Sequence, residues 1–110
     1  MTSSSAHVEH VWTFLSNYAH VLVCLARDPD ATQREIAERV GVTERAIARI
    51  ISELEAVGVI SHRREGRRNH YEIDLEAPLR HPLEAERTVG DLLSALLSRR
   101  EAVALGLRRR

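Results

Sequence analysis

One stretch, residues 32–71, most constrains the fold of this chain, because two amphipathic helix patterns are followed there by a hairpin pattern. Thr32 and Glu35 have the spacing of a capping box, in which each side chain satisfies a free amide of the first helical turn. A helix is therefore predicted over residues 32–40. Gly41 supplies the backbone freedom that the chain needs to end this helix and turn.

A second helix is predicted over residues 43–57, with Thr43 as its cap. At about 100° of rotation per residue, the apolar side chains gather on one side: Ile47, Ile50, Ile51 and Leu54, with Ala46 and Val57 at the edge. The other side carries Arg45, Ala48, Arg49, Ser52 and Ala56. Small residues let a helix approach a surface closely, and a guanidinium pairs with the O6 and N7 acceptors of guanine in the major groove. A solvated helix face is the alternative interpretation.

A hairpin with a basic tip is predicted next. Its strand patterns cover residues 59–64 and 69–73, and residues 65–68 form the turn. Residues 63–68 contain four arginines and one glutamate, a local charge of +3 in a chain whose formal net charge is zero. Positive charge concentrated beside an arginine-bearing helix favours contact with phosphates, or entry of an arginine into a narrow minor groove.

Residues 14–73 resemble the winged helix-turn-helix domain of small bacterial transcriptional regulators, the broad group that includes the MarR-like and ArsR-like repressors. Three segments carry the resemblance: residues 34–51, 54–60 and 66–71. It is specific to the architecture more than to any one regulator. It implies a mainly α fold with a small β-hairpin, in which the second helix reads the major groove and the wing touches the flanking backbone.

The expected DNA contacts follow from the outward side of the second helix and from the wing. Base readout is expected from Arg45, Ala48, Arg49 and Ser52. Contact with the DNA backbone or the minor groove is expected from Gln33, Thr43, Arg63, Arg64, Arg67, Arg68 and Asn69. The implied function is a sequence-specific regulator of transcription that binds double-stranded DNA. By family analogy it is a dimeric repressor that reads a palindromic site with helix 43–57 and contacts the flanking backbone with wing 60–73.

The rest of the chain is expected to support this domain. Residues 1–10 are polar and serine-rich, which predicts a flexible arm. Residues 11–76 form the winged domain, whose scaffold is an apolar helix that starts at Ser16 or Asn17 and ends near Asp28, before a proline. Residues 77–110 contain an extended connection, a final helix from about Leu83, and a basic tail.

The final helix carries more apolar surface than the end of a small domain needs. One stripe holds Ala85, Val89, Leu92, Leu93, Leu96 and Leu97. We expect a dimer in which Val89, Leu92, Leu93, Leu96 and Leu97 pair with their copies and with the apolar cluster of Trp12 and Phe14. The alternative is that this helix folds back over the scaffold helix within one subunit.

Other kinds of function have little support. We find no nucleophile motif, no phosphate-binding glycine loop and no suggestive pair of carboxylates, so no enzyme is expected. The six histidines lack the spacing of a metal site, so no metal or other cofactor is expected. No polar group of residues suggests an effector site between the Trp12 cluster and the last helix. A protein-interaction module is the alternative function, which the zero net charge favours and the segregation of charge opposes.

The expected location is the cytoplasm. The single cysteine, Cys24, cannot form an internal disulfide, and a reducing compartment is the default for such a chain. It is interpreted as a small buried apolar residue, with a redox-sensing thiol as the alternative. No apolar stretch reaches the roughly 18–20 residues of a membrane span.

Overall fold

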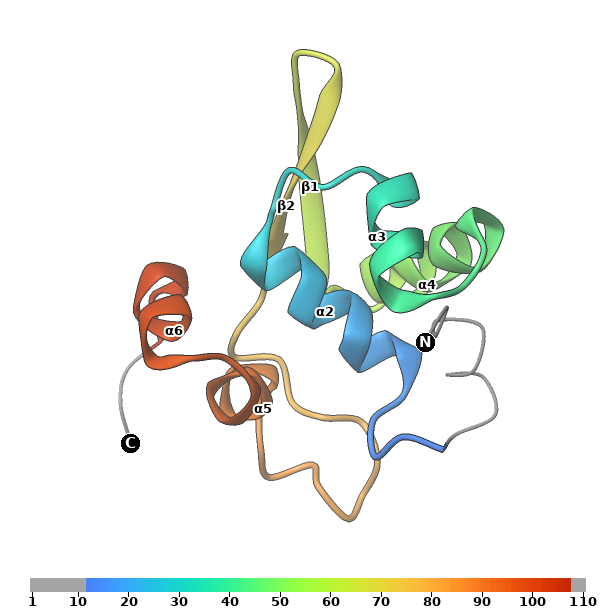
Figure 1. Cartoon of the computed structure of the whole chain (residues 1–110). Coiled ribbons are helices and arrows are strands. Elements are labelled where there is room, and N and C mark those ends of the chain that lie inside the picture. The colour runs from blue at the N-terminus through green and yellow to red at the C-terminus, as the bar shows by residue number, and fades with distance from the viewer. Residues whose placement is uncertain (1–11, 108–110) are drawn as a thin grey trace, which may run out of the picture.

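The computed structural model describes residues 12–107, so the arm expected at residues 1–10 lies outside the described residues (Figure 1). The elements are α2 (Asn17–Arg27), α3 (Gln33–Val40), α4 (Glu44–Ala56), β1 (Ile60–Glu65), β2 (Arg68–Ile73), α5 (Val89–Leu96) and α6 (Arg99–Leu105). The predicted fold class, mainly α with one small hairpin, is confirmed. Figure 1 shows the hairpin projecting away from the helices beside α3 and α4.

The helices predicted over residues 32–40 and 43–57 form as their caps indicate. The Thr32 hydroxyl accepts a hydrogen bond from the Glu35 amide (3.1 Å), and the Glu35 carboxylate accepts one from the Thr32 amide (2.8 Å). Gly41 ends α3 at φ 90°, a left-handed conformation in which a side chain would be strained. The Thr43 hydroxyl then accepts a hydrogen bond from the Ala46 amide at the start of α4.

The core holds α4 against α2 and α3. Its members on these three helices are Val21, Leu22, Leu25, Ile36, Ala37, Ile47, Ile50, Ile51 and Leu54. The four apolar residues of α4 on this list are those expected on its inner side, each at most 7% exposed. Because this side faces α2 and α3, the arginine side of α4 is turned to the solvent.

The hairpin pairs antiparallel from Ile60 opposite Ile73 to Glu65 opposite Arg68. Its turn is therefore Gly66 and Arg67, two residues shorter than expected. Gly66 has φ 62° at the first turn position, as a type II′ turn requires, and this turn follows the twist of the flanking strands. The pairing of the two strands can therefore continue to Glu65 and Arg68, which flank the turn.

The prediction of a single final helix from about Leu83 is wrong. Residues 81–87 form turns and bends, and two short helices, α5 and α6, follow. Each starts at a capping box: the Thr88 hydroxyl accepts from the Asp91 amide, and the Ser98 hydroxyl accepts from the Glu101 amide. The second cap follows extended backbone at Leu97, and this breaks the expected stripe.

The first of these helices, α5, lies against α2. Its Val89 and Leu93, with Leu97 just after it, are at most 7% exposed and belong to the core of this chain. For these three side chains the structure has the alternative arrangement, folding back within one subunit. Ala85 lies in the turns, outside any helix. Among residues 12–107, no helix has the length and apolar character to cross a membrane.

Candidate nucleic-acid interface

The outer side of α4 carries the residues expected to read bases. Arg45, Arg49 and Ser52 are exposed, and Ala48 between them is half-buried. Within residues 12–107, neither of the two guanidinium groups takes part in a hydrogen bond or an ion pair. Both can therefore pair with an external acceptor without first breaking a contact inside the protein.

Two further candidates lie at helix starts. Thr43 is exposed, but its hydroxyl oxygen already accepts the bond from the Ala46 amide at 3.0 Å. Its hydrogen remains available to a phosphate oxygen, since a hydroxyl both donates and accepts. Gln33 is the first residue of α3 and is half-buried.

Two of the four wing arginines are neutralised inside the protein. Arg63 binds the Glu65 carboxylate through Nε (2.8 Å) and the Glu72 carboxylate through a terminal nitrogen (2.6 Å). Arg68 donates to the Asp30 carbonyl (2.9 Å) and pairs with Glu35 (3.2 Å). The local charge of +3 counted from the sequence therefore overstates the field at the wing.

The remaining wing cations are Arg64 and Arg67. Arg64 donates to the Gly66 carbonyl at 3.3 Å, which leaves its charge uncompensated. Arg67 occupies the turn, is exposed, and forms no ion pair with any described residue. The Asn69 amide is half-buried and donates to the Tyr71 hydroxyl at 3.5 Å. The structure thus places the available positive charge at the tip of the wing.

Contacts with the loop between α2 and α3 fix the base of the wing. The Tyr71 amide donates to the Pro29 carbonyl at 2.9 Å, and Arg68 reaches the same loop and Glu35. The hydrogen bond from the Thr32 amide, and after it the one from Arg68, hold the pKa of Glu35 below its ordinary value. On the other strand, His62 pairs with Glu55 of α4. These contacts fix the position of the wing relative to the arginine side of α4. They could not be predicted from the sequence.

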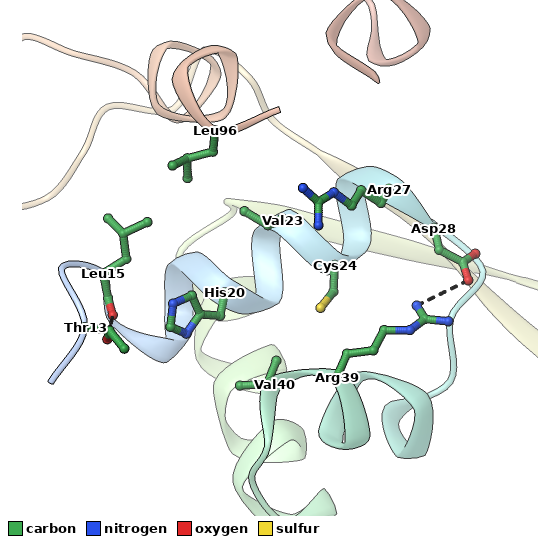
Figure 2. Close-up of a pocket in the computed structure, with 10 residues that line it drawn as sticks. All are labelled: Thr13, Leu15, His20, Val23, Cys24, Arg27, Asp28, Arg39, Val40 and Leu96. Atoms are coloured by element: carbon green, nitrogen blue, oxygen red, sulfur yellow. Dashed lines mark hydrogen bonds and ion pairs between the residues drawn. The ribbon is translucent and has the colours of Figure 1, made fainter. Parts of the chain in front are cut away.

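Polar side chains also meet in a cavity of about 770 Å³ that α2, α3 and α5 line with the segment before α2 (Figure 2). Its walls contain His20, Cys24 and Arg27 of α2 and Arg39 of α3. Arg39 pairs with Asp28 at 3.5 Å. The expectation of no polar group near the last helix is therefore wrong. The reason is that these residues lie on separate helices that only the fold brings together.

The candidate dimer residues divide into three sets by exposure. Trp12 is 75% exposed and Phe14 is 92% exposed, and their rings touch edge to face with centroids 4.8 Å apart. Leu92 and Leu96 are half-buried on α5, whereas the other three leucine and valine candidates lie in the core described above. Within the described chain, the aromatic pair has no apolar cover.

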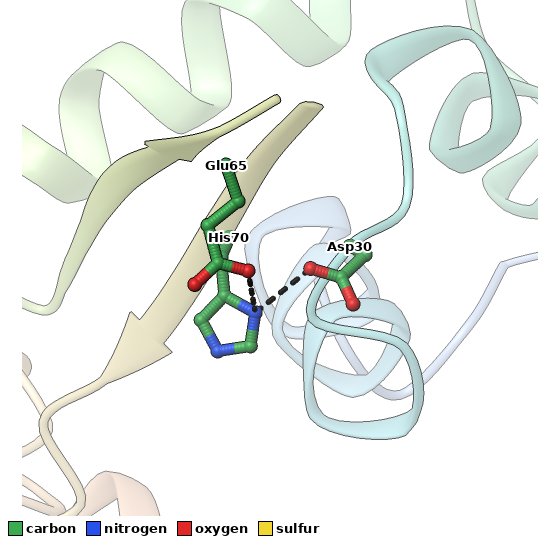
Figure 3. Close-up of side chains that lie close together, drawn as sticks. All are labelled: Asp30, Glu65 and His70. Carbon is green, nitrogen blue, oxygen red and sulfur yellow. Dashed lines mark hydrogen bonds and ion pairs between the residues drawn. The ribbon is translucent and has the colours of Figure 1, made fainter. Parts of the chain in front are cut away.

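One group of side chains within residues 12–107 has the donors of a metal site. Asp30, Glu65 and His70 come together at the junction of the wing and the loop between α2 and α3 (Figure 3). Their spacing in sequence gives no metal motif, because each comes from a different segment.

An outward arginine helix set beside an anchored hairpin with a basic tip is the architecture of a winged helix-turn-helix fold. Residues 20–61 match the family model described as winged helix-turn-helix DNA-binding, which confirms the resemblance of this part of the chain to a winged helix-turn-helix domain. No protein with a curated function matches the chain in sequence.

Among solved structures, the chain is similar to the PcaV transcriptional regulator from Streptomyces coelicolor, determined in complex with its natural ligand. The two share 25% sequence identity with a TM-score of 0.49, and the match covers 84% of this chain and 69% of that one.

Proposed function

We propose that this protein is a sequence-specific, dimeric transcriptional regulator that binds a palindromic site in double-stranded DNA. The observation that carries the proposal is the exposed pair of arginines, Arg45 and Arg49, one turn apart on a helix whose opposite side is buried. Arg45, Ala48, Arg49 and Ser52 read bases, and Arg64 and Arg67 contact the backbone or the minor groove beside them. Gln33, Thr43 and Asn69 support the backbone contacts.

Dimerisation is proposed from the aromatic pair. Trp12 and Phe14 expose a continuous apolar surface, which is unfavourable in water until another surface covers it. A second copy provides such a surface and relates the two recognition helices by a two-fold axis. Half-sites about 34 Å apart, one turn of DNA, are then expected. Repression follows if the occupied site overlaps a promoter.

The test begins with selection of bound fragments from random duplex DNA, which yields the preferred site. Arg45→Ala and Arg49→Ala should each lose about 1–3 kcal/mol of discrimination between this site and random DNA. Arg67→Ala should weaken binding to both DNAs alike and reduce the dependence of log K on log salt by about one. Arg80→Ala, an exposed arginine in the connection after the wing, is the matched control and should change neither quantity.

Equal losses on specific and random DNA for all three variants would refute the assigned roles. Failure to retain any duplex at low salt would refute DNA binding itself. It would favour the alternative of a protein-interaction module, which salt-insensitive binding to a protein partner would support.

A further inference from the structure

Three potential metal ligands meet where the wing joins the helix-turn-helix. Asp30 lies in the loop between α2 and α3, Glu65 is the last residue of β1, and His70 lies on β2. The His70 Nδ1 is 2.8 Å from an Asp30 carboxylate oxygen and 3.9 Å from a Glu65 carboxylate oxygen (Figure 3). The three donor atoms all lie within 4.8 Å of one another.

These separations are close to those of a tetrahedral zinc site. Bonds of about 2.0–2.2 Å place tetrahedral ligand atoms roughly 3.3–3.6 Å apart. The Asp30–His70 distance must therefore open by roughly half an ångström, and the Glu65–His70 distance must close by a similar amount. The side chains of Asp30 and Glu65 are 51% and 48% exposed, so both can adjust, and water can take a fourth position.

We propose that Asp30, Glu65 and His70 bind a divalent ion of the zinc class and that this ion strengthens DNA binding by the wing. An imidazole nitrogen together with two carboxylates suits Zn²⁺ or Co²⁺. Mg²⁺ and Ca²⁺ prefer oxygen ligands throughout, so the histidine disfavours them. His70 binds the ion through Nδ1 as a neutral imidazole with its proton on Nε2, so an imidazolium releases one proton to the solvent and a neutral Nδ1–H ring changes tautomer.

Neighbouring groups already orient the ligands. Arg63 Nε binds one oxygen of Glu65 at 2.8 Å, while the other oxygen is the one directed at His70. Arg68 donates to the Asp30 carbonyl, and the Tyr71 amide donates to the preceding residue of the same loop. Partners of this kind fix ligand orientation in metal sites. The loop and both strands thus hold the three donor atoms close to one another even without the ion.

The ion changes the charge of the wing. A bound divalent ion adds two positive charges beside the tip, where the Asp30 and Glu65 carboxylates lie. The potential at Arg64 and Arg67 becomes more positive, and contact with phosphates is favoured. The ion also links the wing to the loop before α3, so less freedom is lost when DNA is bound. This inference rests on the proposed DNA-binding function and specifies its regulation.

The test uses the full chain after removal of metal with a chelator. Co²⁺ is titrated and followed by its visible absorption, and Zn²⁺ binding is measured by competition with Co²⁺. His70→Gln keeps a hydrogen-bond donor for Asp30 but removes the imidazole, and Glu65→Gln removes one carboxylate. His81→Gln is the matched control, because His81 is an exposed histidine in the connection after the wing and lies outside the cluster.

The wild type and His81→Gln should bind one ion per chain, and the two cluster variants should lose at least about tenfold in affinity. Zn²⁺ should tighten DNA binding by about fivefold or more in the wild type and His81→Gln, and leave His70→Gln unchanged. Without metal, the wild type, His81→Gln and His70→Gln should bind DNA comparably, since glutamine replaces each histidine at nearly constant size. Glu65→Gln removes a negative charge beside the wing tip and is therefore used for the metal titration alone.

Absence of saturable Co²⁺ binding, or equal binding by His70→Gln and the wild type, would overturn the metal site. Binding that depends on His70 but leaves DNA affinity unchanged would overturn its regulatory role. If the metal-free proteins bind DNA and no ion binds, the inference fails while the proposed function stands. If an ion binds at His70 and no DNA is bound, the proposed function fails instead.

Discussion

The Tyr18 hydroxyl donates a hydrogen bond to the Glu53 carboxylate, which joins the start of α2 to the outer edge of α4. Glu53 lies one turn after Arg49, so this contact also touches the proposed DNA-reading side. The hydrogen bond to Glu53 is the main reason that the pKa of Tyr18 lies above its ordinary value of about 10, and desolvation and the charge of Glu53 raise it further.

The raised pKa predicts how Tyr18 affects stability at high pH. Because the folded value exceeds the unfolded one, the stabilisation is complete below the unfolded pKa and is lost as pH rises through the folded pKa. The phenolate absorbance of Tyr18, measured in a Tyr71→Phe background, should show a midpoint above that of a free tyrosine. Glu53→Gln should lower this midpoint, because the negative charge is removed. Equal midpoints with Glu53 and with Gln would contradict the role assigned to this contact.

The wing arginines should differ in their effect on DNA binding. Arg67→Ala should reduce the salt dependence by about one phosphate contact. Arg63→Ala should reduce it by less, because Glu65 and Glu72 already neutralise Arg63. Titration of duplex binding at several salt concentrations measures both slopes. A larger change for Arg63→Ala would show that its ion pairs open on DNA.

Gly90→Ala should destabilise the C-terminal packing. A Cβ at this position would lie 2.9 Å from the Leu75 carbonyl oxygen and 3.1 Å from a methyl group of Leu107, and the backbone atom cannot move aside cheaply. Overpacking of this kind costs about 1–3 kcal/mol. Ser94→Ala, on the same helix, is the control and should stay within about 0.5 kcal/mol. Urea unfolding measures both, and equal midpoints would contradict the close approach.

Cys24 should react slowly with alkylating reagents near neutral pH. Burial raises the pKa of its thiol, while Arg39 and Arg27 partly oppose this effect. The reactive thiolate is therefore scarcer than in a free cysteine. The rate of carboxymethylation, followed by mass, should increase with pH and should be higher for the protein unfolded in urea at the same pH. A folded rate equal to the unfolded rate near neutrality would contradict the burial of this thiol.

The helix-turn-helix could be predicted because its signals are local. Thr32 with Glu35, Gly41, and the spacing of the isoleucines in α4 each determine structure within a few residues. The outward position of Arg45 and Arg49 followed from helical geometry once the apolar side was known. These residues are among those for which sequence and structure agree best.

The C-terminal region shows what local patterns do not determine. Leucine spacing predicts one helix, but the capping boxes of Thr88 with Asp91 and of Ser98 with Glu101 divide the region into two. The charge of the wing could not be predicted from composition, because the pairing of Arg63 with Glu72 depends on strand register. The pairing of Arg68 with Glu35 joins residues 33 positions apart, and only the complete fold brings them into contact.

The exposed aromatic pair gives this molecule its own optical reporter. Trp12 is the only tryptophan in the sequence, and three quarters of its surface faces water. Its fluorescence therefore comes from a single place beside the start of α2, without a background from other indoles. Any event that covers this face, including assembly of two chains, can be followed as a blue shift of the emission in unlabelled protein.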